Sequence, residues 1–209
     1  NGPGTFAQIW MHNGYLMVDG EKMSKSLGNF ITVRDLLKSH HGETIRLCML
    51  MTHYRQPLNW SADALAQAKD SLDKLYGALR FADRIQEGVI NNTVIEALSN
   101  DLNSPLAISA LHNMARDLYK SSDRTQAANL IETGKLMGLL KLSPEDWFRW
   151  KPKGLENSLG DQEIDALVLE RTKARKTRDF ARSDAIRDSL ESQGILLEDG
   201  HHGTSWKRI

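Results

Sequence analysis

The chain has 209 residues, with 27 lysines and arginines against 27 aspartates and glutamates, so its formal net charge is zero. Apolar residues make up 40% and charged residues 26%, which is typical of a globular protein with one large domain or two small ones. This balance excludes a mainly disordered chain, and the longest apolar stretches, such as Leu47–Met51, are too short to cross a membrane.

The single cysteine, Cys48, cannot form a disulfide within the chain, which favours a reducing compartment, the cytoplasm. Cys48 lies in an apolar helical run, and its spacing from the histidines fits no zinc pattern, so we expect it in the core. No signal peptide is visible, and the chain opens with Asn1 rather than methionine. We therefore expect a piece of a longer protein.

The N-terminal part changes from a strand pattern to a helical one. Residues 6–18 are expected to form short strands or the end of a larger fold, and a turn is expected at Asp19-Gly20. The pair Thr32 and Asp35 resembles a helix start, and a second helix is expected over residues 43–53.

A helical bundle is expected over residues 61–150. Ser61 is a good N-cap, and the leucines at 65, 72 and 79 recur every seven residues, which predicts one long helix over 62–87. Alanine or leucine at 68, 75 and 82 completes the seam. Further helices are expected from Ser104-Pro105 to about Lys120, over 126–140, and from Ser143-Pro144 onward. These helices predict an antiparallel arrangement.

Residues 151–160 are expected to be a linker. Beyond it, the pattern predicts helices over 162–178 and 180–193, closed by Gly194, and then a small β-hairpin. The fold class is thus mainly α, with a small α+β unit at the C-terminus.

The charge is unevenly distributed. Residues 171–182 hold six basic side chains and one acidic one, a pattern typical of phosphate contact by a nucleic-acid-binding protein. A solvated helix face explains the same pattern equally well.

The loop Lys22-Met23-Ser24-Lys25-Ser26 is the strongest candidate in the sequence for a ligand-binding site. Two lysines, two hydroxyls and the following Gly28 suit a polyphosphate, although no P-loop motif exists in the chain. By composition alone, a solvated turn is the simpler interpretation.

The literal string of this loop resembles the signature of the class I aminoacyl-tRNA synthetases. Three further stretches resemble the cysteinyl-tRNA synthetases: His53-Tyr54-Arg55 with Leu58–Ser61, Asp101–Pro105, and Leu197–Gly200 with Gly203–Trp206. The resemblance covers nearly the whole chain from about Phe6.

The resemblance implies a domain order. Residues 1–31 would end a Rossmann-type catalytic domain and carry the loop, and 32–60 would form a stem-contact connection. Residues 61–150 would form the bundle, 151–160 the linker, and 161–209 an anticodon-binding unit.

The resemblance also implies an activity: ATP, with Mg²⁺, activates cysteine, which is then transferred to tRNA(Cys). Lys25, assisted by Lys22, is expected to contact ATP during catalysis, and the ATP-binding set is Lys22, Met23, Ser24, Lys25 and Ser26. The family's H-I-G-H motif and zinc ligands are absent from this chain, so the zinc ion belongs to the parent enzyme. A monomer without membrane contact is expected.

Motif matching assigns anticodon contact to four residues of the C-terminal unit: Arg175, Phe180, Asp184 and Asp199. Arginine can stack and donate, phenylalanine offers a flat face, and the aspartates can accept from base N–H groups. A core position is the alternative for Phe180, and Trp206 is expected in the core.

Other functions stay open at this point. A non-catalytic tRNA-binding module could retain the loop, and a related ligase that joins cysteine to a sugar would share it. The terminal unit, residues 161–209, counts against the sugar ligase, which needs no anticodon reader.

Overall fold

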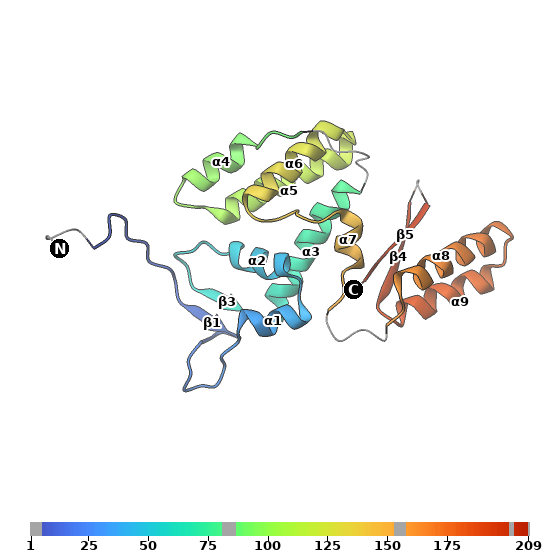
Figure 1. The fold of residues 1–209 in the computed structure, drawn as a ribbon, viewed down its shortest axis with the longest axis horizontal. Coiled ribbons are helices and arrows are strands. Elements are labelled where there is room, and N and C mark those ends of the chain that lie inside the picture. The colour runs from blue at the N-terminus through green and yellow to red at the C-terminus, as the bar shows by residue number, and fades with distance from the viewer. Residues whose placement is uncertain (1–5, 81–86, 153–157, 201–202, 209) are drawn as a thin grey trace. The chain divides into compact units, whose positions relative to one another are not determined.

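The computed structural model describes residues 6–80, 87–152, 158–200 and 203–208, and it divides the chain into two compact units. The first contains residues 1–36 and 42–141, and the second contains residues 37–41 and 142–209. The predicted mainly helical class is confirmed (Figure 1).

A small sheet in the first unit holds strands in the order β2-β1-β3. The strands β1 (Leu16–Val18) and β2 (Glu21–Lys22) are antiparallel, and β3 (Leu58–Trp60) runs parallel to β1. Asp19 and Gly20 both have positive φ (50° and 84°), as the tightest hairpin turns require, so the predicted turn is confirmed. The strands expected before Tyr15 are not formed in the described residues 6–15, so the prediction is wrong there.

Two short helices follow the sheet hairpin. Helix α1 (Val33–Ser39) begins as predicted, because Thr32 Oγ1 accepts from the Asp35 backbone N–H at 3.1 Å. Helix α2 (Gly42–Leu50) ends three residues before the predicted end at His53. It ends early because residues 53–55 turn away to contact Asp101. Cys48 lies buried in α2, as expected.

Helix α3 (Ala62–Leu79) is the central helix of the first unit. Ser61 caps it, and the seam leucines 65, 72 and 79 are buried, with Ala68 and Leu75 between them. The predicted end at residue 87 is wrong, because residues 87–91 are not helical and pair with α6 through Val89 N–H and Asn91 N–H. Ala82 lies outside the described residues.

The remaining helices of the first unit are α4 (Asn92–Ser99), α5 (Ser104–Ser121) and α6 (Arg124–Leu136). Helix α4 was not predicted, although Asn91 caps it and Val94 and Ala97 bury one face. The cap of α5 is Asn103 rather than Ser104. Helix α6 ends before residue 140 because Gly138 (φ 74°) turns the chain back. Helix α5 packs against α3, α4 and α6, which forms the bundle.

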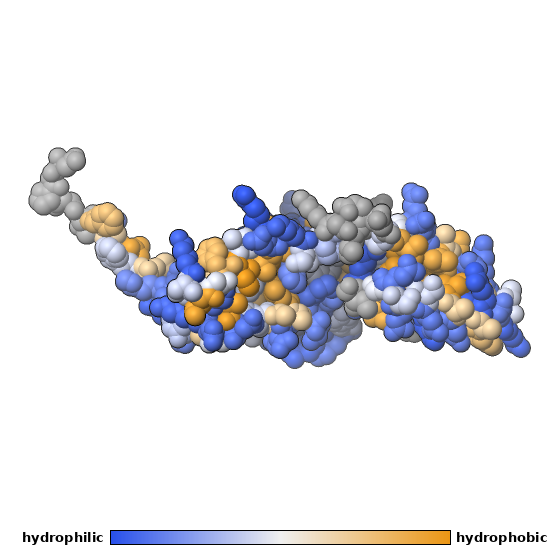
Figure 2. Space-filling model, turned by 90° about the horizontal axis from the view of Figure 1, so that it is seen from below, coloured by the Kyte–Doolittle hydropathy of each residue, from blue (hydrophilic) through white to orange (hydrophobic). Residues whose placement is uncertain are grey.

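The first unit also leaves many large apolar side chains exposed. Figure 2 shows hydrophobic patches among polar side chains on the face it draws. Exposed examples are Phe6 (93%), Ile9 (82%) and Trp10 (65%). Apolar exposure on this scale marks surfaces that contact another segment or molecule.

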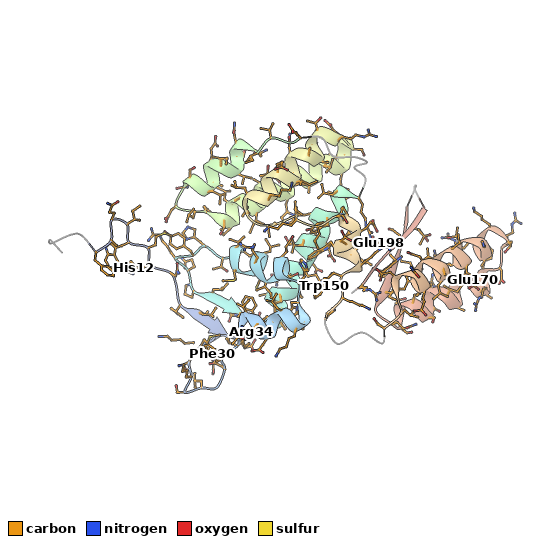
Figure 3. The ribbon with its side chains drawn as sticks, in the orientation of Figure 1. His12, Phe30, Arg34, Trp150, Glu170 and Glu198 are labelled. Carbon is orange, nitrogen blue, oxygen red and sulfur yellow. The ribbon has the colours of Figure 1, made fainter. Side chains whose placement is uncertain are left out.

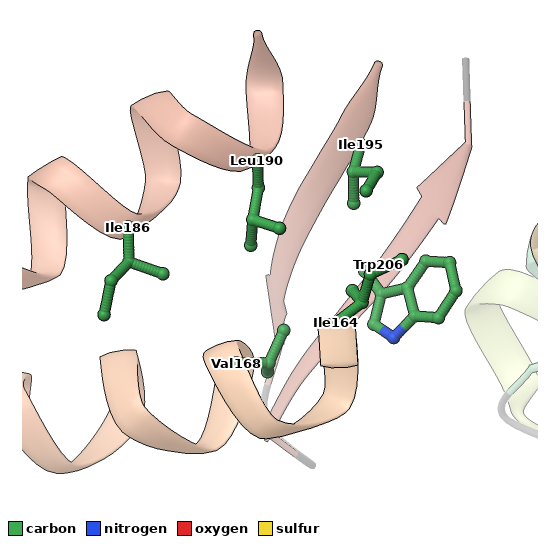
Figure 4. Close-up of a cluster of buried hydrophobic side chains, with 6 residues drawn as sticks. All are labelled: Ile164, Val168, Ile186, Leu190, Ile195 and Trp206. Atoms are coloured by element: carbon green, nitrogen blue, oxygen red, sulfur yellow. The ribbon is translucent and has the colours of Figure 1, made fainter. Parts of the chain in front are cut away.

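The second unit contains α8 (Asp161–Lys176), α9 (Phe180–Glu191) and an antiparallel hairpin of β4 (Ile195–Gly200) and β5 (Gly203–Arg208). Both helices end about two residues earlier than predicted, and Gly194 (φ 73°) follows α9 rather than capping it directly. Figure 4 shows the core, which includes Trp206 as predicted: Ile164, Val168, Ile186, Leu190, Ile195 and Trp206.

Helix α7 (Pro144–Arg149) begins at the predicted cap, Ser143, but belongs to the second unit rather than to the bundle. The Arg149 guanidinium lies 4.9 Å from the Trp206 ring centroid and donates to Asp165 at 3.2 Å. His41 makes edge contacts with Trp147 and Trp150 in the same unit. No helix in the described residues is long and apolar enough to span a membrane.

Candidate functional site

The lysine- and serine-rich loop is closed by its own side chains. The Ser24 backbone N–H donates to Asn29 Oδ1 at 3.0 Å, and the Asn29 side-chain amide donates to the Lys22 carbonyl at 3.4 Å. Ser24 Oγ lies 3.2 Å from Ser26 Oγ and accepts from the Leu27 N–H at 3.3 Å. Gly28 (φ 67°) makes the left-handed turn that brings Asn29 back. The Asn29 side chain therefore holds the two ends of this loop together.

The two lysines of the loop lie on its exposed side. Lys22 Nζ is 5.9 Å from the Tyr15 ring centroid, and Lys25 forms no ion pair within the described part of the chain. Met23 is partly buried and anchors the loop, because its N–H donates to the Leu16 carbonyl at 3.0 Å. Figure 3 labels Phe30 directly beyond the loop and Arg34 on α1. Two exposed ammonium groups on a pre-shaped loop can bind a polyphosphate.

A second polar cluster joins two of the motifs that carried the resemblance. Asp101 accepts from Arg55 Nε at 2.6 Å and from Tyr54 Oη at 2.5 Å, and its carbonyl lies 2.9 Å from His53 Nε2. These hydrogen bonds, with Arg55 the largest cause, lower the pKa of Asp101 to about 2. Asp101 and Leu102 both have positive φ (53° and 51°). Both motifs are visible in the sequence, but a local pattern cannot predict their contact, because 46 residues separate Arg55 from Asp101.

Two of the four residues assigned to anticodon contact lie together in the second unit. Arg175 Nη1 donates to Asp199 Oδ2 at 2.6 Å. Arg171, which was not assigned, holds the same carboxylate with two bonds of 2.9 and 3.0 Å. Thr204 Oγ1 donates to Asp199 Oδ1 at 2.6 Å. These donors, Arg171 foremost, hold the pKa of Asp199 far below its usual range.

The other two assigned residues lie on α9. Phe180 is 61% exposed, so the alternative of a core position is wrong. Asp184 lies one turn later, 3.6 Å from Arg187. The hydrogen bond to Asp199 is the main cause that raises the pKa of Arg171, and the charge of Asp184 adds to it. Phe180 makes no ring contact within the described residues.

The basic run separates into two groups. Arg171 and Arg175 pair with Asp199, and Arg182 pairs with Glu170 at 2.7 Å. The other three, Lys173, Lys176 and Arg178, are exposed and form no ion pair with any described residue. Only this second group is available to phosphates without the loss of an internal contact.

The described residues do not form a zinc site. No group of three histidine, cysteine, aspartate or glutamate side chains in them could hold a metal ion. Burial raises the pKa of the Cys48 thiol, which disfavours the thiolate that zinc requires.

Two family models match the chain. The model described as tRNA synthetases class I (C) catalytic domain matches residues 2–70, which contain the loop and the small sheet. The model described as DALR domain matches residues 93–141, which contain α4 to α6.

Similar curated proteins are named cysteine–tRNA ligase. The protein of Paramagnetospirillum magneticum is 52% identical over 97% of this chain and 46% of its own length. Those of Rhodospirillum rubrum and Saccharophagus degradans are 48% and 45% identical over 100% of this chain, and over 46% and 47% of their own lengths. The chain thus spans about half the length of the relatives it matches.

Proposed function

The chain belongs to the cysteine–tRNA ligase family, and we propose that it supplies the ATP loop and the tRNA contacts of such an enzyme. The observation that carries the proposal is the similarity to the proteins of Rhodospirillum rubrum and Saccharophagus degradans over 100% of this chain, which includes the loop, the bundle and the terminal unit. The loop is the end of a Rossmann-type catalytic domain, and the stem-contact connection follows it.

The first step of the proposed reaction joins cysteine to the α-phosphate of ATP, bound with Mg²⁺, and releases pyrophosphate. Negative charge grows on the departing pyrophosphate, so a cation placed there stabilises the transition state more than the ground state. Lys25 is this cation, and Lys22 assists from the end of β2. Met23, Ser24 and Ser26 hold the loop in the shape that presents both ammonium groups.

The second step transfers cysteine to tRNA(Cys), and the second unit binds the anticodon. Local clustering of charge, rather than the net charge of the unit, supports this assignment. Residues 161–209 hold nine basic and ten acidic residues, but six basic residues and one acidic residue lie within 171–182. The segment matched by the DALR domain holds five acidic and five basic residues. Arg175, Phe180, Asp184 and Asp199 are the proposed anticodon-contacting residues.

Cysteine, ATP and tRNA(Cys) are the proposed ligands, and the enzyme acts as a monomer in the cytoplasm. The buried, unpaired Cys48 is compatible with that reducing compartment. The zinc ion expected for the family has no ligand set in the described residues, so no step here depends on it.

The test of the catalytic role is Lys25→Ala in a full-length ligase that carries this sequence. We expect cysteine-dependent ATP–pyrophosphate exchange to fall about 10²–10³-fold, because the contact forms mainly in the transition state. Lys120→Ala is the matched control, since Lys120 is 71% exposed on α5, far along the chain from the loop. Exchange at the wild-type rate in Lys25→Ala would remove Lys25 from the mechanism.

The alternative function is a non-catalytic tRNA-binding module that retains the loop. A full-length protein that binds tRNA(Cys) but performs no cysteine-dependent exchange would support it. Exchange and charging of tRNA(Cys) by the same protein would exclude it.

A further inference from the structure

Asp199 uses its entire hydrogen-bonding capacity inside the protein. Its Oδ1 accepts from Arg171 Nη1 at 2.9 Å and from Thr204 Oγ1 at 2.6 Å. Its Oδ2 accepts from Arg171 Nη2 at 3.0 Å and from Arg175 Nη1 at 2.6 Å. A carboxylate offers about four acceptor positions, and all four are filled. A nucleobase can therefore donate to Asp199 only after one of these donors leaves.

The three donors differ in how firmly they are held. Arg171 is 5% exposed, lies within α8 and grips both carboxylate oxygens with one planar fork. Thr204 lies directly opposite Asp199 in the ladder between β4 and β5. Arg175 lies one helical turn beyond Arg171, has a side chain that is 49% exposed, and makes a single bond to the carboxylate. Arg175 is therefore the donor that can leave at least cost.

We propose that Arg171 is a positioning residue for anticodon recognition, and the proposal rests on the anticodon-binding function proposed above. Arg171 fixes the Asp199 carboxylate, while Arg175 turns from Asp199 to an acceptor on a nucleobase. The position that Arg175 vacates on Oδ2 then accepts an N–H of the same base. Arg175 and Asp199 thus act together on one base edge, and Arg171 touches no RNA.

This arrangement selects a base edge over a phosphate. A base edge presents acceptors and N–H donors side by side, so it can satisfy both Arg175 and Asp199. A phosphate accepts from Arg175 but donates nothing, and its charge would face the Asp199 carboxylate. Lys173, Lys176 and Arg178, which have no carboxylate partner in the described residues, suit phosphates instead.

The chemistry also requires arginine at position 171. A lysine would keep the positive charge but would lose the fork that fixes both oxygens of the carboxylate. The carboxylate could then rotate, and the direction of its free acceptor position would no longer be defined.

The experiment measures binding of the 209-residue chain to two anticodon stem-loop RNAs, one with the cysteine anticodon and one with a swapped anticodon, over a salt series. We expect Arg171→Met and Arg171→Lys each to reduce the preference for the cysteine anticodon about tenfold, the range of one base contact. The salt slope should stay unchanged, because the buried Arg171 neutralises no phosphate. Lys176→Met is the control, and it should weaken both RNAs equally and flatten the slope.

A double-mutant cycle separates positioning from a general structural role. In an Asp199→Asn background, Arg171→Lys should cause little further loss of anticodon preference, because the carboxylate that it positions is already absent. If Arg171→Met fails to fold, as judged by circular dichroism, Arg171→Lys and Thr204→Val carry the test. Thr204→Val removes one donor from Oδ1 and should also reduce the preference.

Two outcomes would overturn the inference, and they differ. If folded Arg171 variants keep the wild-type preference, Arg171 does not position Asp199 for reading. If the wild-type chain binds both RNAs equally, this unit does not read the anticodon, and the proposed RNA function fails together with the inference.

Discussion

Asp101 occupies a bend between α4 and α5 where two successive residues have left-handed backbone. Non-glycine residues disfavour this conformation, so the surrounding contacts must hold it. Arg55, Tyr54 and His53 provide these contacts, all from the segment that enters the bundle through β3. Asp101 therefore fixes the bend through residues that are remote in sequence.

This contact predicts a pH dependence of stability. The pKa of Asp101 is lowered from 3.8 to about 2, so its charged form stabilises the folded state above pH 4. That contribution is lost as the pH falls from about 4 to about 2, where the carboxylate becomes protonated in the folded state. Asp101→Asn should lower the melting temperature at pH 7, and the two melting curves should converge near pH 2.

The matched control for this measurement is Asp117→Asn. Asp117 is also an exposed aspartate, and among the described residues it forms one ion pair, to Lys120, which is long at 3.9 Å. Asp117→Asn should leave the dependence of the melting temperature on pH unchanged. If the melting temperature of Asp101→Asn depends on pH as that of the wild type does, Asp101 does not stabilise the bend in the way described.

At the scale of elements, α3 is the helix on which the bundle is built. Its seam leucines are buried against α2 and α5, and Leu72 is completely buried. Buried Glu43 of α2 adds a polar link, because it accepts from Tyr76 Oη of α3 at 2.9 Å and from the Leu140 N–H at 2.9 Å. Both apolar packing and a satisfied buried carboxylate thus hold α3 in place.

Leu72→Ala should lower the free energy of unfolding by about 2–5 kcal/mol, because it leaves a cavity in a close-packed core. Chemical denaturation followed by circular dichroism measures the change. Leu106→Ala is the control, since Leu106 on α5 is 50% exposed and should change stability little. Equal stability of Leu72→Ala and wild type would show that the leucine seam of α3 does not stabilise the bundle.

At the scale of the whole molecule, a net charge of zero conceals one basic region. Half of its six cations pair with carboxylates, and Lys173, Lys176 and Arg178 remain without an ion pair among the described residues. Phe180 is exposed only two residues beyond Arg178. The region thus offers charge for phosphates and a flat face for a base.

These two kinds of contact predict different salt responses of tRNA binding. Lys176→Ala should weaken binding to all tRNAs alike and reduce the salt slope by roughly 0.7–0.9, the value for one phosphate contact. Phe180→Ala should lose about 1–3 kcal/mol of stacking and leave the slope nearly unchanged. Binding of tRNA(Cys) by the chain over a salt series measures both.

The two variants serve as controls for each other. A slope that falls in Phe180→Ala as much as in Lys176→Ala would show that the ring does not stack on a base. Wild-type affinity in both variants would mean that the basic run is only a solvated helix face.

The sequence by itself determined the class of the fold and most of its helices. Caps at Thr32, Ser61 and Ser143 and the seven-residue seam of α3 are local signals, because each depends on residues within one or two helical turns. The hairpin of the terminal unit and the buried Trp206 follow from equally local patterns. The literal motifs also sufficed to indicate the family.

Only the tertiary structure decided which distant residues meet. The end of α2, the end of α3 and the assignment of α7 to the second unit depend on contacts with residues far away in sequence. The same holds for the proposed positioning contact, because Arg171 and Asp199 are 28 residues apart and lie on a helix and a strand. A local pattern showed Arg171 as one of six basic residues, and it could not reveal that this arginine is buried. Long-range pairing depends on how the elements pack, and that information is spread over the whole chain.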